Sequence, residues 1–268
     1  MRQRFCLVLG LVAAFPFAAS AQQSKTETVT VNVRPGATMR YIAVSASQPK
    51  AALILLTGGN GVLKLDADGK IGALSGNFLI RNRNLFAREG LYVASLDAAS
   101  DQQAGMNGAG RLSGQHAQDL AKVIADVKQR AGGVPVWVAG TSAGTLTTAN
   151  IAARLRGNGA HGVVFTSTMT QLVPDLCGKS VYDAELSAFT GPVLVVSHAD
   201  DGCGCSPGGA GPNNKLLAAL KGASAKEQKV FTGGSPPKSG PCDAYSPHGY
   251  FGIEAETVKT IANWIKSH

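Results

Sequence analysis

Several features are absent from this 268-residue sequence, and each absence excludes a class of protein. No apolar run reaches the roughly 20 residues that a membrane-spanning helix needs. Basic residues form no long run, so the formal net charge of +8 indicates a solvated basic surface and no nucleic-acid partner. The 33 glycines follow no G-X-Y period, which excludes a collagen-like chain. Charged residues are only 16% and hydrophobic residues 44%, a balance that excludes disorder and favours a folded core.

The N-terminal segment has the pattern of a secretory signal peptide. Arg2 and Arg4 come first, an apolar run covers Phe5 to Ala19, and an Ala-Ser-Ala cleavage pattern ends at Ala21. A membrane anchor is the alternative, which the shortness of the apolar run disfavours. We therefore expect residues 1–21 to be removed and the mature chain to be periplasmic or secreted, with no membrane span.

Cysteine is scarce, and its distribution agrees with export. Of five cysteines, Cys6 leaves with the signal peptide. The mature chain keeps Cys177, Cys203, Cys205 and Cys242, an even number in an oxidising compartment. Two disulfides are the expectation.

Short apolar runs recur along the chain in the pattern of strands. Residues 28–33 alternate between polar and apolar side chains, which predicts a half-buried strand, and residues 40–44 are its expected hairpin partner across a Pro-Gly turn. Residues 51–57 are continuously apolar, which is typical of a parallel strand buried on both faces. Further strands are expected at 91–96, 134–139, 162–165 and 192–196, with a weaker one at 229–232.

Helical periodicity lies between these runs. Helices are expected at 78–88, from Ser113 to about 127, at 145–155, at 216–221 and at about 253–265. Strand and helix in repeated alternation predict an α/β fold: a mostly parallel, doubly wound sheet with helices on both faces and a leading antiparallel hairpin. No linker divides the chain, so residues 22–268 are expected to form a single domain.

The Gly-Thr-Ser-Ala-Gly sequence at residues 140–144 is the sharpest local feature. It follows one expected strand directly and opens the next expected helix. A G-x-S-x-G pattern in that position is the nucleophile elbow, a turn so tight that its flanking positions require glycine. Because the turn exposes the serine oxygen beside a helix N-terminus, Ser142 is the candidate nucleophile. An ordinary Gly-rich turn is the alternative.

A serine hydroxyl needs a base within hydrogen-bond reach and an acid that orients the base. Asp200 and Asp201 follow the expected strand at 192–196, and His248 lies on a loop between the last strand and the last helix. Asp201 is the preferred acid and Asp200 the alternative. The chain order of Ser142, Asp201 and His248 is the order that this kind of sheet gives to a Ser-Asp-His triad.

An oxyanion hole would complete such a site. One donor is expected to be the amide of Ala143, and the other Gly59 in the Gly-Gly-Asn-Gly loop after the strand at 51–57, with Asn60 as a possible side-chain contributor. A phosphate-binding loop is excluded here because neither nucleotide-binding glycine fingerprint is present.

Together, the loop at 57–61, the elbow at 140–144, the Asp pair and the Pro-His-Gly at 247–249 resemble the α/β-hydrolase superfamily, particularly small exported bacterial carboxylesterases and dienelactone-hydrolase-like enzymes. The resemblance covers roughly residue 50 onward and implies an eight-stranded, mostly parallel sheet. In the family the acid often ends a His-Gly-x-x-Asp pattern. That spacing selects Asp201, whereas Ser-His in place of His-Gly leaves Asp200 open.

The expected function is hydrolysis of a carboxylic ester through an acyl-enzyme on Ser142, with a small-molecule ester as partner and neither cofactor nor metal. Another acyl hydrolase, such as a thioesterase, lactonase or peptidase, would use the same triad, and a non-catalytic binding protein on this fold is a further alternative. Few residues separate the strands at 162–165 and 192–196, so any lid is small and soluble or short-acyl substrates are favoured. Arg81 and Arg83 are expected on a solvated helix face, with an anionic substrate group as the alternative partner.

A triad would also constrain the cysteines, because the acid and base loops must then meet. Cys242 is expected to pair with Cys203 or Cys205, and Cys177 with the remaining one. A bond between Cys203 and Cys205 would close a very small, strained ring and is the least favoured pairing.

Overall fold

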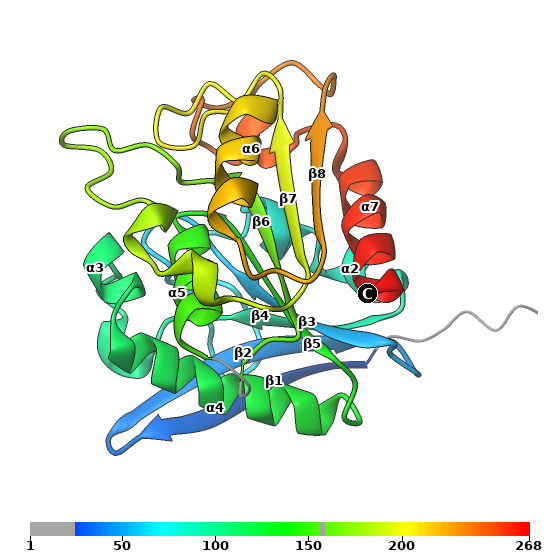
Figure 1. The fold of residues 1–268 in the computed structure, drawn as a ribbon. Helices are drawn as coiled ribbons and strands as arrows, with labels where there is room; N and C mark the ends of the chain where they lie inside the picture. Colours follow the sequence, from blue (N-terminus) through cyan, green and yellow to red (C-terminus); the bar gives the residue numbers. More distant parts are fainter. Residues whose placement is uncertain (1–24, 156–158) are drawn as a thin grey trace, which may run out of the picture.

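An eight-stranded sheet forms the centre of the molecule (Figure 1). The computed structural model describes residues 25–155 and 159–268, so the expected signal peptide lies outside the described residues. The strand order is β1-β2-β4-β3-β5-β6-β7-β8. The strands are β1 (Lys25–Arg34), β2 (Ala37–Ser45), β3 (Ala51–Leu56), β4 (Leu91–Leu96), β5 (Val136–Ser142), β6 (Gly162–Thr168), β7 (Val193–His198) and β8 (Lys226–Phe231).

The sheet is mostly parallel with an antiparallel beginning. β1 and β2 form the expected hairpin, and β2 pairs antiparallel with β4. Every pairing from β4 through β3, β5, β6 and β7 to β8 is parallel. The predicted fold class is therefore confirmed. Because parallel neighbours run the same way, the loops that follow β3, β5 and β7 all leave from one end of the sheet.

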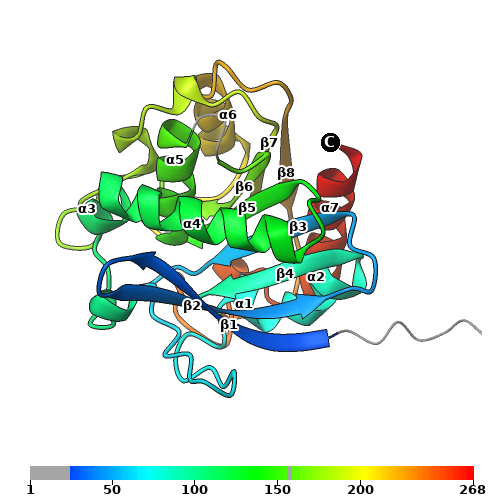
Figure 2. The same cartoon turned by 90° about the horizontal axis from the view of Figure 1, so that it is seen from below.

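Helices cover both faces of the sheet (Figures 1 and 2). The helices are α1 (Phe78–Arg81), α2 (Arg83–Arg88), α3 (Gly108–Arg111), α4 (Gly114–Arg130), α5 (Gly144–Arg154), α6 (Ala210–Ala219) and α7 (Glu254–Ser267). Side chains of α1, α2 and α7 share one buried cluster with the sheet, whereas α4, α5 and α6 pack on clusters of the other face. Short 3₁₀ turns occupy Ser100–Gln102, Val181–Asp183, Leu186–Ala188 and Pro247–Gly249.

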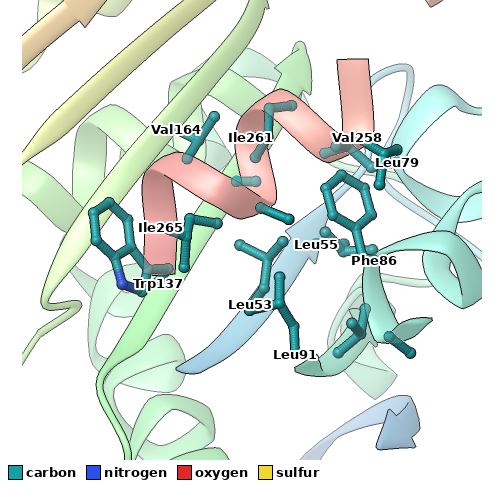
Figure 3. Packing of buried hydrophobic residues seen from close by; sticks show 14 of the residues in the cluster. Leu53, Leu55, Leu79, Phe86, Leu91, Trp137, Val164, Val258, Ile261 and Ile265 are labelled. Carbon is teal, nitrogen blue, oxygen red and sulfur yellow. The ribbon is translucent and has the colours of Figure 1, made fainter. Parts of the chain in front are cut away.

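Alternation along β3 explains why its sequence is continuously apolar. Leu53 and Leu55 face the cluster that contains α7, where Ile261 packs (Figure 3). Ala52 and Ile54 face the opposite cluster against α4. Both faces of the strand are thus removed from water. Burial of apolar surface of this kind is the dominant stabilising contribution to folding.

The expected helix at 78–88 is two helices. Asn77 begins α1 and its side chain accepts a hydrogen bond from the Leu79 amide. Asn82 then interrupts the run, because its side-chain amide donates to the Phe78 carbonyl at 2.8 Å and offers the backbone a local alternative to continued helix. The weak pattern expected near 229–232 is β8, which lies at the sheet edge and is mostly half-buried or exposed. Among the described residues, no helix is long and apolar enough to cross a membrane.

Candidate active site

The turn from β5 into α5 has the geometry of a nucleophile elbow. Ser142 has φ +53°, a left-handed backbone conformation that is uncommon for a residue with a side chain. A Cβ at Gly140 would lie 2.3 Å from Thr148 Oγ1, and a Cβ at Gly144 would lie 2.3 Å from the Leu56 carbonyl oxygen. Glycine at both positions therefore lets the turn pack against β3 and α5 while Ser142 stays half-buried and accessible.

His248 and Asp201 contact each other directly. His248 Nδ1 lies 2.9 Å from Asp201 Oδ2, and the Asp201 side chain is fully buried. Because an ionised carboxylate only accepts, the imidazole donates from Nδ1 and keeps Nε2 as the acceptor. The other carboxylate oxygen, Oδ1, accepts the Cys203 amide at 3.0 Å. Asp201 is thereby held in one orientation beneath the histidine.

Asp200, the alternative acid, lies in a different environment. Its side chain is 74% exposed, and its Oδ2 lies 3.9 Å from His198 Nδ1. The Asp200 amide also donates to His198 Nδ1 at 3.1 Å. Of the two adjacent carboxylates, only Asp201 contacts His248.

A cavity of about 230 Å³ contains both Ser142 and His248. His248 Nε2 is buried and has no hydrogen-bond partner among the described residues. Because Asp201 binds the opposite ring nitrogen, Nε2 is the one imidazole atom left to accept a proton. Leu74 and Phe78 form apolar parts of the wall, and the loop around Cys242 forms another side.

Two sets of hydrogen bonds, here called clamps, hold the loop that carries His248, and neither was predicted from the sequence. Arg81 donates to the carbonyls of Gly76 and Gly249 at 2.7 and 2.6 Å and pairs with Glu254 at 2.9 Å. Its side chain is only 14% exposed, so the expectation of a solvated helix face is wrong for Arg81. Both of its terminal nitrogens bind protein groups, because the folded chain brings the base loop beside α1.

The second clamp lies beneath His248. Ser167 Oγ donates to the His248 carbonyl at 2.8 Å, and its amide donates to the Tyr250 hydroxyl. Tyr250 in turn donates to the Val196 carbonyl at 2.9 Å. Burial raises the pKa of Tyr250, so its hydroxyl stays a donor. The ends of β6 and β7 are therefore tied to the base loop.

The candidate oxyanion loop lies beside the serine. A Cβ at Gly58 would lie 2.8 Å from Ser142 Cβ, so glycine is required for this close approach. Gly59 has φ +53° and lines the cavity that contains Ser142. Ala143 follows the serine at the start of α5. The Asn60 side chain accepts the Val62 amide of its own loop and does not line the cavity.

A second cavity of about 480 Å³ begins at the same two candidate donors, Gly59 and Ala143. Its apolar side chains are Met106, Ala109, Leu146, Met169 and Leu176. Lys179 lies at its wall and pairs with Asp183 at 2.8 Å. Ser142 and its neighbour Ala143 thus separate two hollows.

Two disulfides join the loops around the site. Cys203 pairs with Cys242, and Cys177 pairs with Cys205. This is one of the two arrangements that the sequence left open. The first bond links the loop after Asp201 to the loop before His248. Because both Cys203 and Cys205 are consumed in disulfides, neither thiol is free to bind metal, and the described residues contain no cluster of metal-ligating side chains.

The comparisons with known proteins agree with this architecture. The sequence matches no protein-family model and no curated protein. The esterase Pf2001 of Pyrococcus furiosus superposes over 96% of both chains with a TM-score of 0.64 at 12% identity. Dienelactone hydrolase from Anabaena variabilis superposes over 92% of this chain and 99% of its own, with a TM-score of 0.60 at 13% identity. A cold-adapted esterase from an Arctic intertidal metagenomic library superposes over 94% of this chain and 99% of its own, with a TM-score of 0.54 at 14% identity. The chain has the α/β-hydrolase fold.

Proposed function

We propose that this chain is an exported serine hydrolase that cleaves carboxylic esters. His248 Nε2 takes the proton of Ser142 Oγ as the oxygen attacks the ester carbonyl carbon. The amides of Gly59 and Ala143 stabilise the oxyanion of the tetrahedral intermediate. His248 then gives the proton to the leaving alkoxide, and water releases the acyl group by the same steps in reverse. Asp201 keeps the imidazole oriented throughout.

One observation carries the proposal. A buried carboxylate orients His248 through Nδ1, the other ring nitrogen has no partner among the described residues, and His248 lines the same cavity as Ser142. The combination is what distinguishes His248, because a triad base needs one ring nitrogen held by an acid and the other left free to accept the proton of the serine. The unused acceptor is what a general base requires before substrate arrives, since catalytic hydrogen bonds often tighten only in the complex.

The two cavities beside Ser142 favour an ester whose acyl and alcohol groups are both of modest size. One hollow of about 230 Å³ lies on the His248 side, and one of about 480 Å³ lies beyond Ala143. An ester that bridges them would place its carbonyl at the serine. The apolar lining favours uncharged acyl and alcohol groups over strongly charged ones.

Export is supported by the disulfides, which form and persist in oxidising compartments. The proposed signal peptide at residues 1–21 supplies the route. A periplasmic or secreted location follows from the two together.

Labelling with a fluorophosphonate probe tests the mechanism directly. The mature protein and Ser142→Ala would be incubated with the probe and assayed against aryl acetates, butyrates and octanoates. We expect label on Ser142 alone, turnover of the shorter esters, and loss of both in the folded variant. Matched aryl thioesters and lactones decide among acyl hydrolases. A wild-type protein that takes up no label and hydrolyses none of these substrates would support a non-catalytic binding protein.

A further inference from the structure

Arg111, at the end of α3, is a buried cation without an anionic partner. Its exposed fraction is 2%. One terminal nitrogen, Nη2, donates to the Gly59 carbonyl at 3.1 Å and to the Gly58 carbonyl at 3.4 Å. The other, Nη1, donates to Thr147 Oγ1 at 3.3 Å. No carboxylate forms an ion pair with it among the residues that the structure describes, and Nε is buried without a partner.

No carboxylate of the described residues forms an ion pair with Arg111, although the buried Asp97 lines the same small cavity. Burial lowers the pKa of Arg111 to about 10, so the guanidinium is still charged at neutral pH. His116 contacts the same Thr147 hydroxyl at 3.3 Å, and burial together with Arg111 lowers the pKa of His116 to about 4, which keeps this imidazole neutral. A buried, unpaired charge is among the most unfavourable features that a fold can contain. Such a group calls for a role beyond packing.

The carbonyls that Arg111 binds belong to the candidate oxyanion loop. A peptide unit is planar and trans, so its carbonyl and its N–H point in opposite directions. The Gly58 carbonyl and the Gly59 amide share one peptide unit, and the Gly59 carbonyl and the Asn60 amide share the next. A cation that holds both carbonyls on one side therefore fixes both amides toward the other side, and it also polarises them as donors.

The loop is shaped to admit this cation. Gly61 has φ +80°, and a Cβ at this position would lie 2.7 Å from Arg111 Nη2. The Gly61 amide also donates to the Gly58 carbonyl at 3.1 Å, so that carbonyl accepts from two donors. The last glycine of the Gly-Gly-Asn-Gly sequence thus leaves room for the guanidinium beneath the turn.

We infer that Arg111 is a positioning residue for the oxyanion hole, which aims and polarises the Gly59 amide by binding the Gly58 and Gly59 carbonyls. The inference rests on the proposed function. The guanidinium acts from the side of the loop away from the reacting atoms. Its charge favours the oxyanion of the tetrahedral intermediate over the neutral ester, so it contributes to the transition state more than to substrate binding.

The test separates this role from a merely structural one by comparing kcat with KM. Arg111→Met removes the charge and both carbonyl contacts, and Arg111→Lys keeps the charge but loses the planar fork. Arg83→Met is the matched control, because this half-buried arginine of α2 donates to the Ile80 carbonyl of α1. Each would be assayed with p-nitrophenyl acetate and titrated with phenylboronic acid, whose tetrahedral adduct on serine carries an anion like that of the intermediate. Thermal melting monitors folding.

For Arg111→Met we expect kcat to fall about 10- to 100-fold with KM within about threefold, which is less than the loss of a whole oxyanion donor because the Gly59 amide itself remains and loses only its orientation and polarisation. The affinity for phenylboronic acid should fall in parallel. Arg111→Lys should lie between Arg111→Met and the wild type, and Arg83→Met should match the wild type.

Three results would overturn the inference: an unchanged kcat in a folded Arg111→Met, a rise in KM alone, or a loss of kcat without loss of boronate affinity. If Arg111→Met does not fold, the same criteria apply to Arg111→Lys, and wild-type kcat and boronate affinity in that variant would reject the role. Failure of the proposed function is a different outcome, since the wild type itself would then show neither turnover nor fluorophosphonate labelling.

Discussion

At the scale of single residues, adjacent side chains in this chain have opposite environments. Asp201 is fully buried and contacts His248, whereas the Asp200 side chain is 74% exposed. Neighbours in a strand or in the turn that follows it point in different directions, so only one of the two can face the base loop. The preference for Asp201 came from a family spacing, and the geometry gives it a physical reason.

Asp201→Asn should lower kcat about 10³- to 10⁴-fold, because the amide offers the imidazole a donor in place of an acceptor and favours the wrong tautomer. Asp200→Asn is the matched control and should keep kcat within about twofold. Steady-state hydrolysis of p-nitrophenyl acetate measures both. A greater loss in the Asp200 variant would transfer the role of the acid to that residue.

His116 should make the fold sensitive to acid. Its pKa is lowered from 6.5 to about 4, first by burial and then by Arg111. Below pH 6.5 the His116 imidazole is protonated in the unfolded chain, whereas in the folded chain it stays neutral down to about pH 4. The free energy of unfolding therefore falls as the pH drops through this window. The fall from this group is at most about 3 kcal/mol.

Urea unfolding from pH 4 to pH 7 tests this expectation. His116→Gln should flatten the dependence between pH 6.5 and pH 4, and the same change at the exposed His161 should leave it as in the wild type. If the free energy of unfolding depended on pH in the same way in the wild type and in His116→Gln, the role of His116 would be contradicted.

At the scale of elements, the elbow depends on two close backbone contacts. The Cβ of Gly140→Ala would lie 2.3 Å from Thr148 Oγ1 and 2.5 Å from the Gly144 carbonyl oxygen. Overpacking of this kind costs about 1–3 kcal/mol or more. We expect Gly140→Ala to lower the free energy of unfolding by at least that amount and to reduce fluorophosphonate labelling of Ser142.

Gly114→Ala, at the first residue of α4, is the control for the same change in open space, because the nearest atom to its Cβ is Arg154 Nη1 at 4.0 Å. Alanine is the better helix former, so stability there should be unchanged or rise by up to about 1 kcal/mol. Urea denaturation measures both variants. An equal effect at the two positions would mean that the elbow has no special steric demand.

Elements with a strong local pattern were predictable from sequence, and those that depend on tertiary contacts were not. The buried strands and α4 follow from periodicity, and Ser113 caps α4 as expected by accepting the His116 amide. The break at Asn82 depends on one side-chain hydrogen bond, which no periodicity reports. The clamps by Arg81 and Tyr250 and the contacts of Arg111 join segments far apart in the chain, and no local signal marks them.

At the scale of the whole molecule, the candidate site exists only because several loops meet at one end of the sheet. The Cys203–Cys242 disulfide spans 39 residues and the Cys177–Cys205 disulfide spans 28. By the loop-entropy account, each stabilises the fold by about 3–4 kcal/mol. Only the first joins the acid loop to the base loop.

The two bonds should therefore differ in their effect on turnover. Replacing both Cys203 and Cys242 by serine should lower kcat about tenfold or more, since His248 and Asp201 lose their covalent link and effective alignment falls. Replacing Cys177 and Cys205 should lower stability by a similar amount with a smaller change in kcat. Thermal melts and ester hydrolysis of the two double variants decide the matter, and equal kcat values would reject a special role for the first bond.

The Cys203–Cys242 bond also makes activity depend on the redox state of the compartment. The link between the two loops requires oxidation, so a chain that stays in a reducing cytoplasm lacks it. Protein prepared in a reducing host would then be a mixture of tethered and untethered molecules, and its specific activity would report the oxidised fraction as much as the chemistry of Ser142.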